Sequence, residues 1–323
     1  MSFREQRPAR PGRPRKRDRA GIPGRVAALG SLMLVVAVIV VIVLDTAGGR
    51  GSHHASSNLT TTSASGKPRR GTTSRAAAPG GSASVPILVY HVINAQPVGS
   101  SANPDLYTPA SEFSSQMNAL KAGGWHAVTL NQVEAYWTRG TSLGPGKPVV
   151  ITFDNGYSSQ YTNALPILKG LGWVGVENLE VTGLPSSEGG LTDTEIRGLI
   201  AAGWELDTQG LTHADLVTLD PAQLSNQVTA ARQTLQSQFG VPVNWFSYPS
   251  GDYNATVIAA VRSAGYLGAT TVNPGWASPQ QDRFSLPRLV VVASTTPSQL
   301  LAQIASAQTS TTNPSSYTGA GLA

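Results

Sequence analysis

Strand-like and helix-like patterns alternate along the chain from residue 85 to about residue 305. Apolar runs typical of buried strands occur at 85–90, 149–153 and 245–248. Between such runs, apolar residues recur at helical spacing, as after the capping pair Asp220-Pro221. Strand and helix alternate about seven times without an internal linker, which predicts one α/β domain at 85–307. Either a (β/α) barrel or an open doubly wound sheet fits, and the number of repeats favours the barrel.

The first 84 residues have a different pattern. Residues 26–44 form an uncharged run of nineteen residues, long enough to span a bilayer as a helix. The basic segment 1–25 precedes it, so the positive-inside rule predicts a single-pass signal anchor with a cytoplasmic N-terminus and an extracytoplasmic domain. A cleaved signal peptide is the alternative, but its apolar stretch would be shorter and the segment 45–47 is a poor cleavage site. Residues 45–84 are rich in Gly, Ser and Thr and predict a flexible linker.

Charge and composition narrow the functional classes. Residues 1–84 hold 14 Lys and Arg against 3 Asp and Glu, whereas residues 85–323 hold 9 against 15. The folded part is therefore acidic, which argues against nucleic-acid binding despite the basic total. The chain has no cysteine, so disulfides and thiolate metal sites are excluded. It also lacks the glycine-rich motifs of nucleotide-binding loops, and the Thr/Ser/Gly-rich residues 308–323 predict a frayed tail.

The buried run at 149–153 ends abruptly in Asp154-Asn155-Gly156. An Asn-Gly turn closing a hairpin is one interpretation, but residues 157–172 have helical spacing rather than a partner strand. A parallel strand would instead deliver Asp154 and Asn155 to the C-terminal edge of the sheet, where α/β enzymes place their chemistry. Polar residues also follow other predicted strands at His91, at Gln209 to His213 and at Tyr248-Pro249-Ser250. We expect these groups to share one rim.

At these positions the sequence resembles the polysaccharide deacetylases, the carbohydrate esterases with a NodB-homology domain. Thr152-Phe-Asp-Asn-Gly-Tyr157 is similar to the Thr-Phe-Asp-Asp-Gly motif of that family. The stretches 85–91, 208–216, 246–251 and 286–289 resemble its other motifs in the same order. The resemblance implies a single distorted (β/α) barrel, TIM-like and of NodB type. It also implies hydrolysis of N-acetyl groups on glycans such as peptidoglycan or poly-N-acetylglucosamine.

The family motif further implies a general base at Asp154 and a divalent metal, most commonly zinc, held by an aspartate and two histidines. In this chain the ligand positions correspond to Asn155, Gln209 and His213, so only the last keeps the family residue. Zinc prefers anionic or imidazole ligands, and the two amides offer only neutral oxygens. Lowering the pKa of a metal-bound water from about 15.7 to about 7 supplies roughly 12 kcal/mol, which a hydrogen bond of about 1 kcal/mol does not replace. Metal-dependent activity is therefore doubtful.

The remaining rim residues are assigned to substrate binding. Tyr248, Pro249, Ser250 and Gly251 lie in the stretch that resembles the third motif, and Arg288 lies in the closing one. His91 belongs to the same rim if it is not a core histidine. These substrate-binding residues are His91, Tyr248, Pro249, Ser250, Gly251 and Arg288.

Three hypotheses follow for the function. The first is a membrane-anchored extracytoplasmic deacetylase, monomeric, acting on cell-wall or surface glycans. The second is a pseudoenzyme that binds glycan or a partner without hydrolysis. The third is metal-free hydrolysis by a pair formed by Asp154 and His213, which requires the two side chains to lie within hydrogen-bond reach.

Overall fold

A computed structural model describes residues 79–100, 102–182, 189–309 and 314–318. The predicted basic tail and membrane-spanning helix lie outside these residues, as does most of the predicted linker. Within the described part of the chain, none of the helices has the length and hydrophobicity needed to cross a bilayer.

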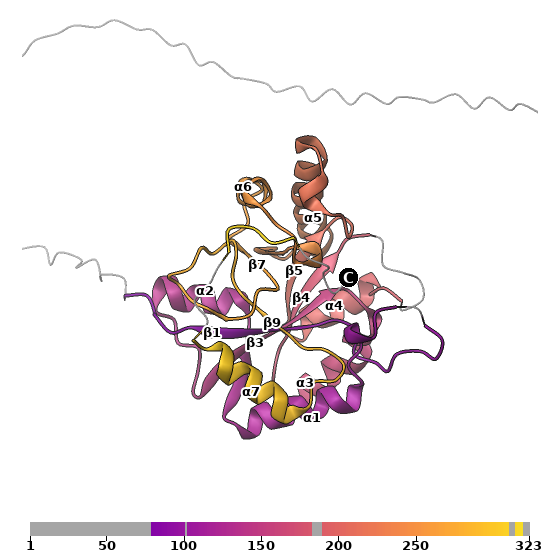
Figure 1. Cartoon of the computed structure of the whole chain (residues 1–323), viewed down its shortest axis with the longest axis vertical. Helices are drawn as coiled ribbons and strands as arrows, with labels where there is room; N and C mark the ends of the chain where they lie inside the picture. Colours follow the sequence, from indigo (N-terminus) through magenta and orange to yellow (C-terminus); the bar gives the residue numbers. More distant parts are fainter. Residues whose placement is uncertain (1–78, 101, 183–188, 310–313, 319–323) are drawn as a thin grey trace, which may run out of the picture. The chain divides into compact units, whose positions relative to one another are not determined.

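The described domain is a mixed α/β fold built on a curled sheet of nine strands (Figure 1). Along the main path the strand order is β7-β6-β5-β4-β3-β1-β8, and all neighbours are parallel except β1 and β8. The strands are β1 (Val85–Tyr90), β2 (Trp125–Val128), β3 (Lys147–Asn155), β4 (Val176–Glu180), β5 (Glu205–Gly210), β6 (Trp245–Ser247), β7 (Gly268–Thr270), β8 (Trp276–Ala277) and β9 (Leu289–Val290). The parallel sheet places the C-terminal ends of β3 to β6 along one edge.

The segment that leads into β9 contacts strands at both ends of the curl. Leu286 forms a parallel bridge with Thr270 of β7, and Leu289 pairs with Leu88 of β1. Residues 286–289 therefore lie between β7 and β1 and are hydrogen-bonded to the edges of both strands. This path carries the Arg288 side chain into the interior, where it has no exposed surface.

The described residues form seven α-helices, of which six pack on the outer face of the sheet, with α1, α3 and α7 grouped on one side of it (Figure 1). The remaining helix, α2, packs against the apolar cluster inside the curl. Apolar side chains at helical spacing pack against the strands, and four helices begin with a capping box. The helices are α1 (Ala110–Ala122), α2 (Leu130–Arg139), α3 (Leu165–Leu171), α4 (Asp193–Ala201), α5 (Pro221–Phe239), α6 (Ala255–Ser263) and α7 (Pro297–Ala307).

The apolar core is divided into layers. One cluster lies between the sheet and the group α1, α3 and α7, and a second lies beneath α4, α5 and α6. A third cluster includes Val150, Val176 and Leu286 and fills the inside of the curl near the beginnings of the strands. Polar side chains occupy the inside toward the other edge, so the interior changes from apolar to charged along the direction of the strands.

One functional strand is not marked by an apolar run in the sequence. This strand is β4, which runs from Val176 to Glu180. Three of its five residues are Glu177, Asn178 and Glu180, and all three are buried. Asn178 and Glu180 lie on the same face of the sheet as Asp154, and Glu177 lies on the opposite face, so buried polar residues on both faces hide the strand pattern.

Candidate active site

The Asp154 carboxylate, at the end of β3, is bound on all sides within the half-barrel. Its two oxygens accept a bidentate pair of hydrogen bonds from Arg288, at 2.8 and 2.9 Å. Asn178 Nδ2 donates to the first oxygen at 2.8 Å, and Ser247 Oγ donates to the second at 3.1 Å. A carboxylate has about four acceptor sites, so these four bonds leave none for a water in the described arrangement.

The pKa of Asp154 reflects two opposing influences. Burial, with 2% of the residue exposed, would raise its pKa. The charge and hydrogen bonds of Arg288, helped by His91 and Asn178, outweigh that penalty and hold the pKa of Asp154 below its usual value. A general base works best with a pKa near the working pH, so this carboxylate is a weak base.

Arg288 supports Asp154 rather than contacting solvent. Its Nε donates to the Thr271 carbonyl at 2.8 Å, and its terminal nitrogens also bond the hydroxyls of Thr152 and Ser247. The sequence assigned Arg288 to substrate binding. Its complete burial and internal bonds instead give it a positioning role.

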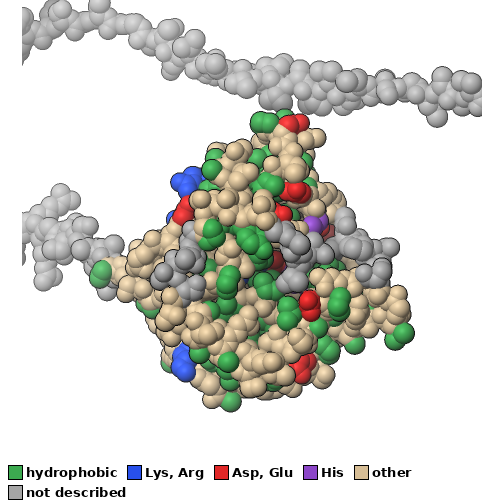
Figure 2. Space-filling model, viewed as in Figure 1, with side chains coloured by type: hydrophobic (Ala, Val, Ile, Leu, Met, Phe, Trp, Pro, Cys, Tyr) green, Lys and Arg blue, Asp and Glu red, His purple; other side chains and the backbone are tan. Residues whose placement is uncertain are grey.

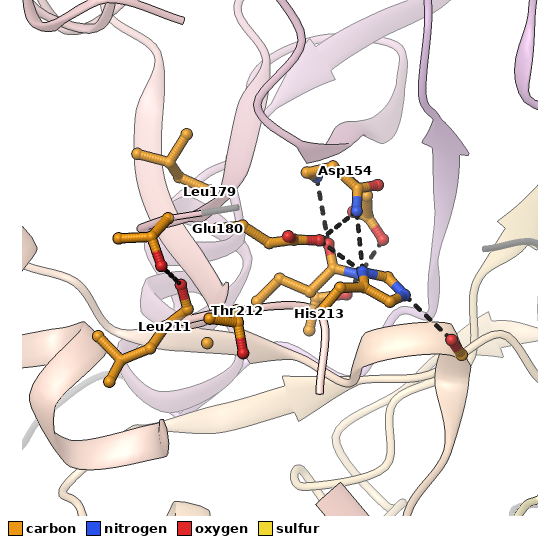
Figure 3. A network of polar contacts seen from close by, with 12 residues as sticks. Asp154, Leu179, Glu180, Leu211, Thr212 and His213 are labelled. Atoms are coloured by element: carbon orange, nitrogen blue, oxygen red, sulfur yellow. Dashed lines mark hydrogen bonds and ion pairs between the residues drawn. The ribbon is translucent and has the colours of Figure 1, made fainter. Parts of the chain in front are cut away.

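A second polar cluster surrounds His213, which follows β5 (Figure 3). The Glu180 carboxylate points at the ring, and its Oε1 lies 2.5 Å from His213 Nδ1. The other ring nitrogen, Nε2, lies 3.0 Å from Ser250 Oγ. The His213 side chain is 28% exposed and that of Glu180 is 2% exposed, so a buried acid holds an accessible imidazole.

The two amides at the family's ligand positions are part of this second cluster. Asn155 Nδ2 donates to Glu180 Oε1 and lies 3.0 Å from His213 Nδ1. Gln209 Oε1 accepts the backbone N–H of Asn155 at 3.2 Å. Asn155 has a φ of 78°, a left-handed conformation that asparagine tolerates better than most residues.

Ser250 lies in a tight turn, Pro249–Gly251, directly after the strand β6. Its φ of 53° is positive, which is uncommon outside glycine and directs the hydroxyl toward His213. Gly251, with a φ of 78°, has no room for a side chain, because a Cβ there would lie 2.3 Å from Val272 Cγ2. Pro249 and Gly251 thus shape the turn that presents Ser250.

The other predicted substrate contacts have different environments. Tyr248 is completely buried, and its hydroxyl donates to the Phe284 carbonyl at 2.7 Å. We therefore assign Tyr248 to the core rather than to substrate binding. His91 is 7% exposed at the end of β1. Burial lowers the pKa of His91 to about 4, and the charges of Arg288 and His213 act in the same direction, whereas the charge of Asp154 opposes them. His91 is therefore neutral at pH 7.

The residues present do not fit the zinc site that the family implies. Asn155 presents its amide nitrogen to the corner, and the Gln209 oxygen is already used by a backbone N–H. His213 Nδ1 is bonded to Glu180 rather than free. A catalytic zinc needs about three anionic or imidazole ligands, and this corner offers one carboxylate and one imidazole that bind each other. Among the described residues, no group of three His, Cys, Asp or Glu is arranged to hold a metal.

The hypothesis of a pair formed by Asp154 and His213 is not supported. Asp154 bonds Arg288, Asn178 and Ser247, whereas His213 bonds Glu180 and Ser250 and lies beside the Asn155 amide. Each side chain belongs to its own cluster, and His213 takes Glu180 as its carboxylate partner. Sequence reasoning missed Glu180 and Asn178. The sequence feature that could have indicated them is their place in the second half of β4, the strand that follows β3 in the chain.

Comparison with known proteins gives consistent relatives. Residues 142–269 match the family model described as polysaccharide deacetylase. The Bacillus subtilis protein YxkH, named provisionally as a polysaccharide deacetylase, is 29% identical over 209 residues, which are 65% of this chain and 72% of that protein. The Streptococcus pyogenes deacetylase PplD, solved with acetate, has a TM-score of 0.63 at 26% identity, covering 69% of this chain and 99% of its own. The Bacillus cereus polysaccharide deacetylase BC0361 has a similar fold, with a TM-score of 0.61 at 24% identity and 69% of each chain covered.

Proposed function

We propose that this domain, which is similar to the NodB-type polysaccharide deacetylases, removes acetyl groups from N-acetylated glycans outside the cytoplasm. The observation that carries the proposal is the accessible imidazole of His213 at the C-terminal edge of the sheet. A buried carboxylate orients it, and a hydroxyl lies against its outer nitrogen. This arrangement can move protons during hydrolysis of a carbon–nitrogen bond.

A neutral, hydroxyl-rich partner also fits the surface. On the face shown in Figure 2, charged side chains are sparse and most of the surface is neutral polar or hydrophobic. Residues 85–323 carry more Asp and Glu than Lys and Arg. Binding to nucleic acid depends on positive charge that neutralises phosphates, so a glycan of the peptidoglycan or poly-N-acetylglucosamine type is the better partner.

The proposed location follows from the segments before the domain. The uncharged run 26–44, preceded by the basic segment 1–25, would anchor the chain in the membrane as one helix. The linker 45–84 would then let a monomeric domain reach glycan near the membrane surface or in the wall.

The direct test is acetate release from N-acetylated oligosaccharides by the purified full chain. We expect release by the unchanged protein and a loss of at least about a hundredfold in His213→Gln, which removes the proton carrier. Ser142→Ala, an exposed loop position, is the matched control and should keep full activity. Absence of acetate release from every N-acetylated oligosaccharide offered would contradict the proposed hydrolysis.

A second candidate function is glycan binding without hydrolysis, and the substitutions at Asn155 and Gln209 favour it. In this case the chain would bind N-acetylated oligosaccharide with measurable affinity, and the products would contain no acetate. The double variant Asn155→Asp with Gln209→His separates the possibilities. If it gains both bound zinc and acetate release, the glycan groove is intact and only the metal site was lost.

A further inference from the structure

We propose that Ser250, His213 and Glu180 form a nucleophile–base–carboxylate triad, so that the acyl group is transferred to a serine rather than attacked by a metal-bound water. The inference rests on the proposed function for the substrate class, an acyl group on a sugar. It goes beyond that function by naming a covalent route and the residue that carries the acyl group.

The first leg of the triad joins Ser250 and His213. Ser250 Oγ lies 3.0 Å from His213 Nε2, within the reach required between a nucleophile and its base. The hydroxyl is only partly buried, and the tight turn with its positive φ projects it from the end of β6. A strained turn after a strand is also how other serine hydrolases present their nucleophile.

The second leg joins His213 and Glu180. With the ring proton on Nδ1, His213 donates to Glu180 Oε1 at 2.5 Å, which leaves Nε2 free to accept the serine proton. Glu180 is buried at the end of β4, and its charge stabilises the imidazolium that forms when the proton arrives. Serine, histidine and a buried acid therefore stand in the order that defines such a triad, on three adjacent strand ends.

The same network explains both departures from the metal site. Gln209 accepts the backbone N–H of Asn155, which supports the left-handed conformation at that residue. The Asn155 amide can then donate to Glu180 Oε1, the oxygen that also holds His213. An aspartate at 155 would place a second negative charge beside Glu180. The Asn155 and Gln209 amides therefore stabilise the arrangement of Glu180 and His213, although they are poor ligands for zinc.

Asp154 does not compete for the role of base. Its acceptor sites are filled by Arg288, Asn178 and Ser247. His213 is the accessible basic group at this edge that has a hydroxyl against it. Asp154 and Arg288 act as positioning residues that fix the ends of β3 and β6.

The reaction balances with water as the second reactant. Ser250 Oγ attacks the acetyl carbon as His213 Nε2 takes the hydroxyl proton. The tetrahedral intermediate collapses when that proton passes from Nε2 to the sugar nitrogen or oxygen, which leaves as an amine or alcohol. Water then attacks the Ser250 ester, gives a proton to Nε2, and acetate leaves as the proton returns to Ser250 Oγ. No electron donor or acceptor is involved.

The test is covalent labelling with a fluorophosphonate, which needs an activated serine but no glycan. We expect near-stoichiometric labelling of the full chain, located at Ser250 by peptide mass spectrometry. Ser250→Ala and Ser250→Gly should remove the label. The glycine variant suits the positive φ and so keeps the turn. His213→Gln should slow labelling by at least a hundredfold.

Glu180 is tested as a positioning residue. Glu180→Gln keeps the shape of the side chain and should slow labelling by about tenfold or more at an unchanged unfolding midpoint, whereas Glu180→Asp should restore part of the rate. Ser142→Ala should label at the rate of the unchanged chain. If Glu180 only stabilised the fold, Glu180→Gln would lower the unfolding midpoint and leave the rate of fluorophosphonate labelling unchanged.

A cysteine variant gives an independent measurement, because the chain has no other thiol. Ser250→Cys should react with iodoacetamide about tenfold faster than the exposed control Ser142→Cys, since a neighbouring imidazole raises the thiolate fraction. Adding His213→Gln should abolish the difference.

Several results would overturn the triad. They are labelling no faster than in His213→Gln, labelling confined to another serine, and stoichiometric divalent metal that is lost with His213. Acetate release without Ser250 labelling would overturn the triad while keeping the proposed function. Labelling of Ser250 without acetate release from any N-acetylated glycan would keep the triad and overturn the proposed substrate.

Discussion

At the scale of single residues, Arg288 and Asp154 form the charged centre of the half-barrel. Arg288 is fully buried, and its guanidinium spans Asp154, Ser247 and the Thr271 carbonyl. Removing one partner from such a buried pair leaves the other charge without compensation, which costs far more than the pair itself contributes.

We therefore expect Arg288→Ala to lower the free energy of unfolding by roughly 3–5 kcal/mol. Urea denaturation followed by circular dichroism would measure it. Arg262→Ala, which removes an exposed ion pair with Asp282, is the matched control and should cost less than about 1 kcal/mol. Equal effects of the two substitutions would contradict the role given to Arg288.

His91 predicts a dependence of stability on pH. Its folded-state pKa of about 4 lies below the unfolded value of 6.5, so the unfolded chain binds the proton first as the pH falls. The contribution of His91 to the free energy of unfolding is complete above about pH 6.5 and is lost as the pH falls to about 4. At about 1.36 kcal/mol per pKa unit, the loss is roughly 3 kcal/mol. The groups facing it are Asp154, Arg288 and His213.

The measurement is the free energy of unfolding at several pH values between 7 and 4. The buried acids Glu177, Glu205 and Asp207, whose pKa values are raised by burial, act in the opposite direction. The quantity to compare is therefore the difference in unfolding free energy between the unchanged chain and His91→Gln, which should fall by roughly 3 kcal/mol from pH 7 to pH 4 because glutamine does not titrate. The pKa of Asp154 is lowered from 3.8, so its contribution to the free energy of unfolding is lost below pH 4, outside the range measured. A profile unchanged by His91→Gln would show that His91 is not buried as a neutral base.

At the scale of elements, the turn after β6 decides where the Ser250 hydroxyl lies. Gly251 has both a positive φ and no space for a Cβ, since Val272 would lie 2.3 Å away. Gly240, which ends α5 with a φ of 69°, has nothing within 4 Å of the same position. The two glycines therefore separate backbone strain from steric overlap.

We expect Gly240→Ala to cost about 1 kcal/mol from the left-handed backbone alone. Gly251→Ala should cost at least about 1 kcal/mol more, because the Val272 side chain or the turn must move. Thermal unfolding of both variants would show the difference. Gly251→Ala should also slow fluorophosphonate labelling, whereas Gly240→Ala should not, and equal behaviour would contradict this account of the turn.

At the scale of the whole molecule, the prediction concerns the membrane. A run of nineteen uncharged residues at about 1.5 Å per residue matches the hydrocarbon thickness. The full chain should sediment with membranes, and protease added to intact spheroplasts should reach the domain. Deletion of residues 1–44 should give a water-soluble protein with the same unfolding midpoint as the domain in the full chain. Recovery of the domain in the medium, cut after residue 44, would instead indicate a cleaved signal peptide.

The sequence by itself determined the α/β class, the order of most strands and helices, and the resemblance that the comparisons confirm. It did so because buried apolar runs, helical spacing and capping residues are local signals. It also located Asp154 and Asn155 at a strand end, because the apolar run before them stops there, and the family resemblance located Gln209 and His213.

Only the tertiary structure decided how these residues are paired. Glu180 and Arg288 come from segments far from His213 and Asp154 in the chain, and a curled parallel sheet, with a strand-like segment between β7 and β1, brings them together. Their pairing depends on which side chains face the same interior. That is a property of strand register and of residues separated by up to 134 positions, which no local pattern records.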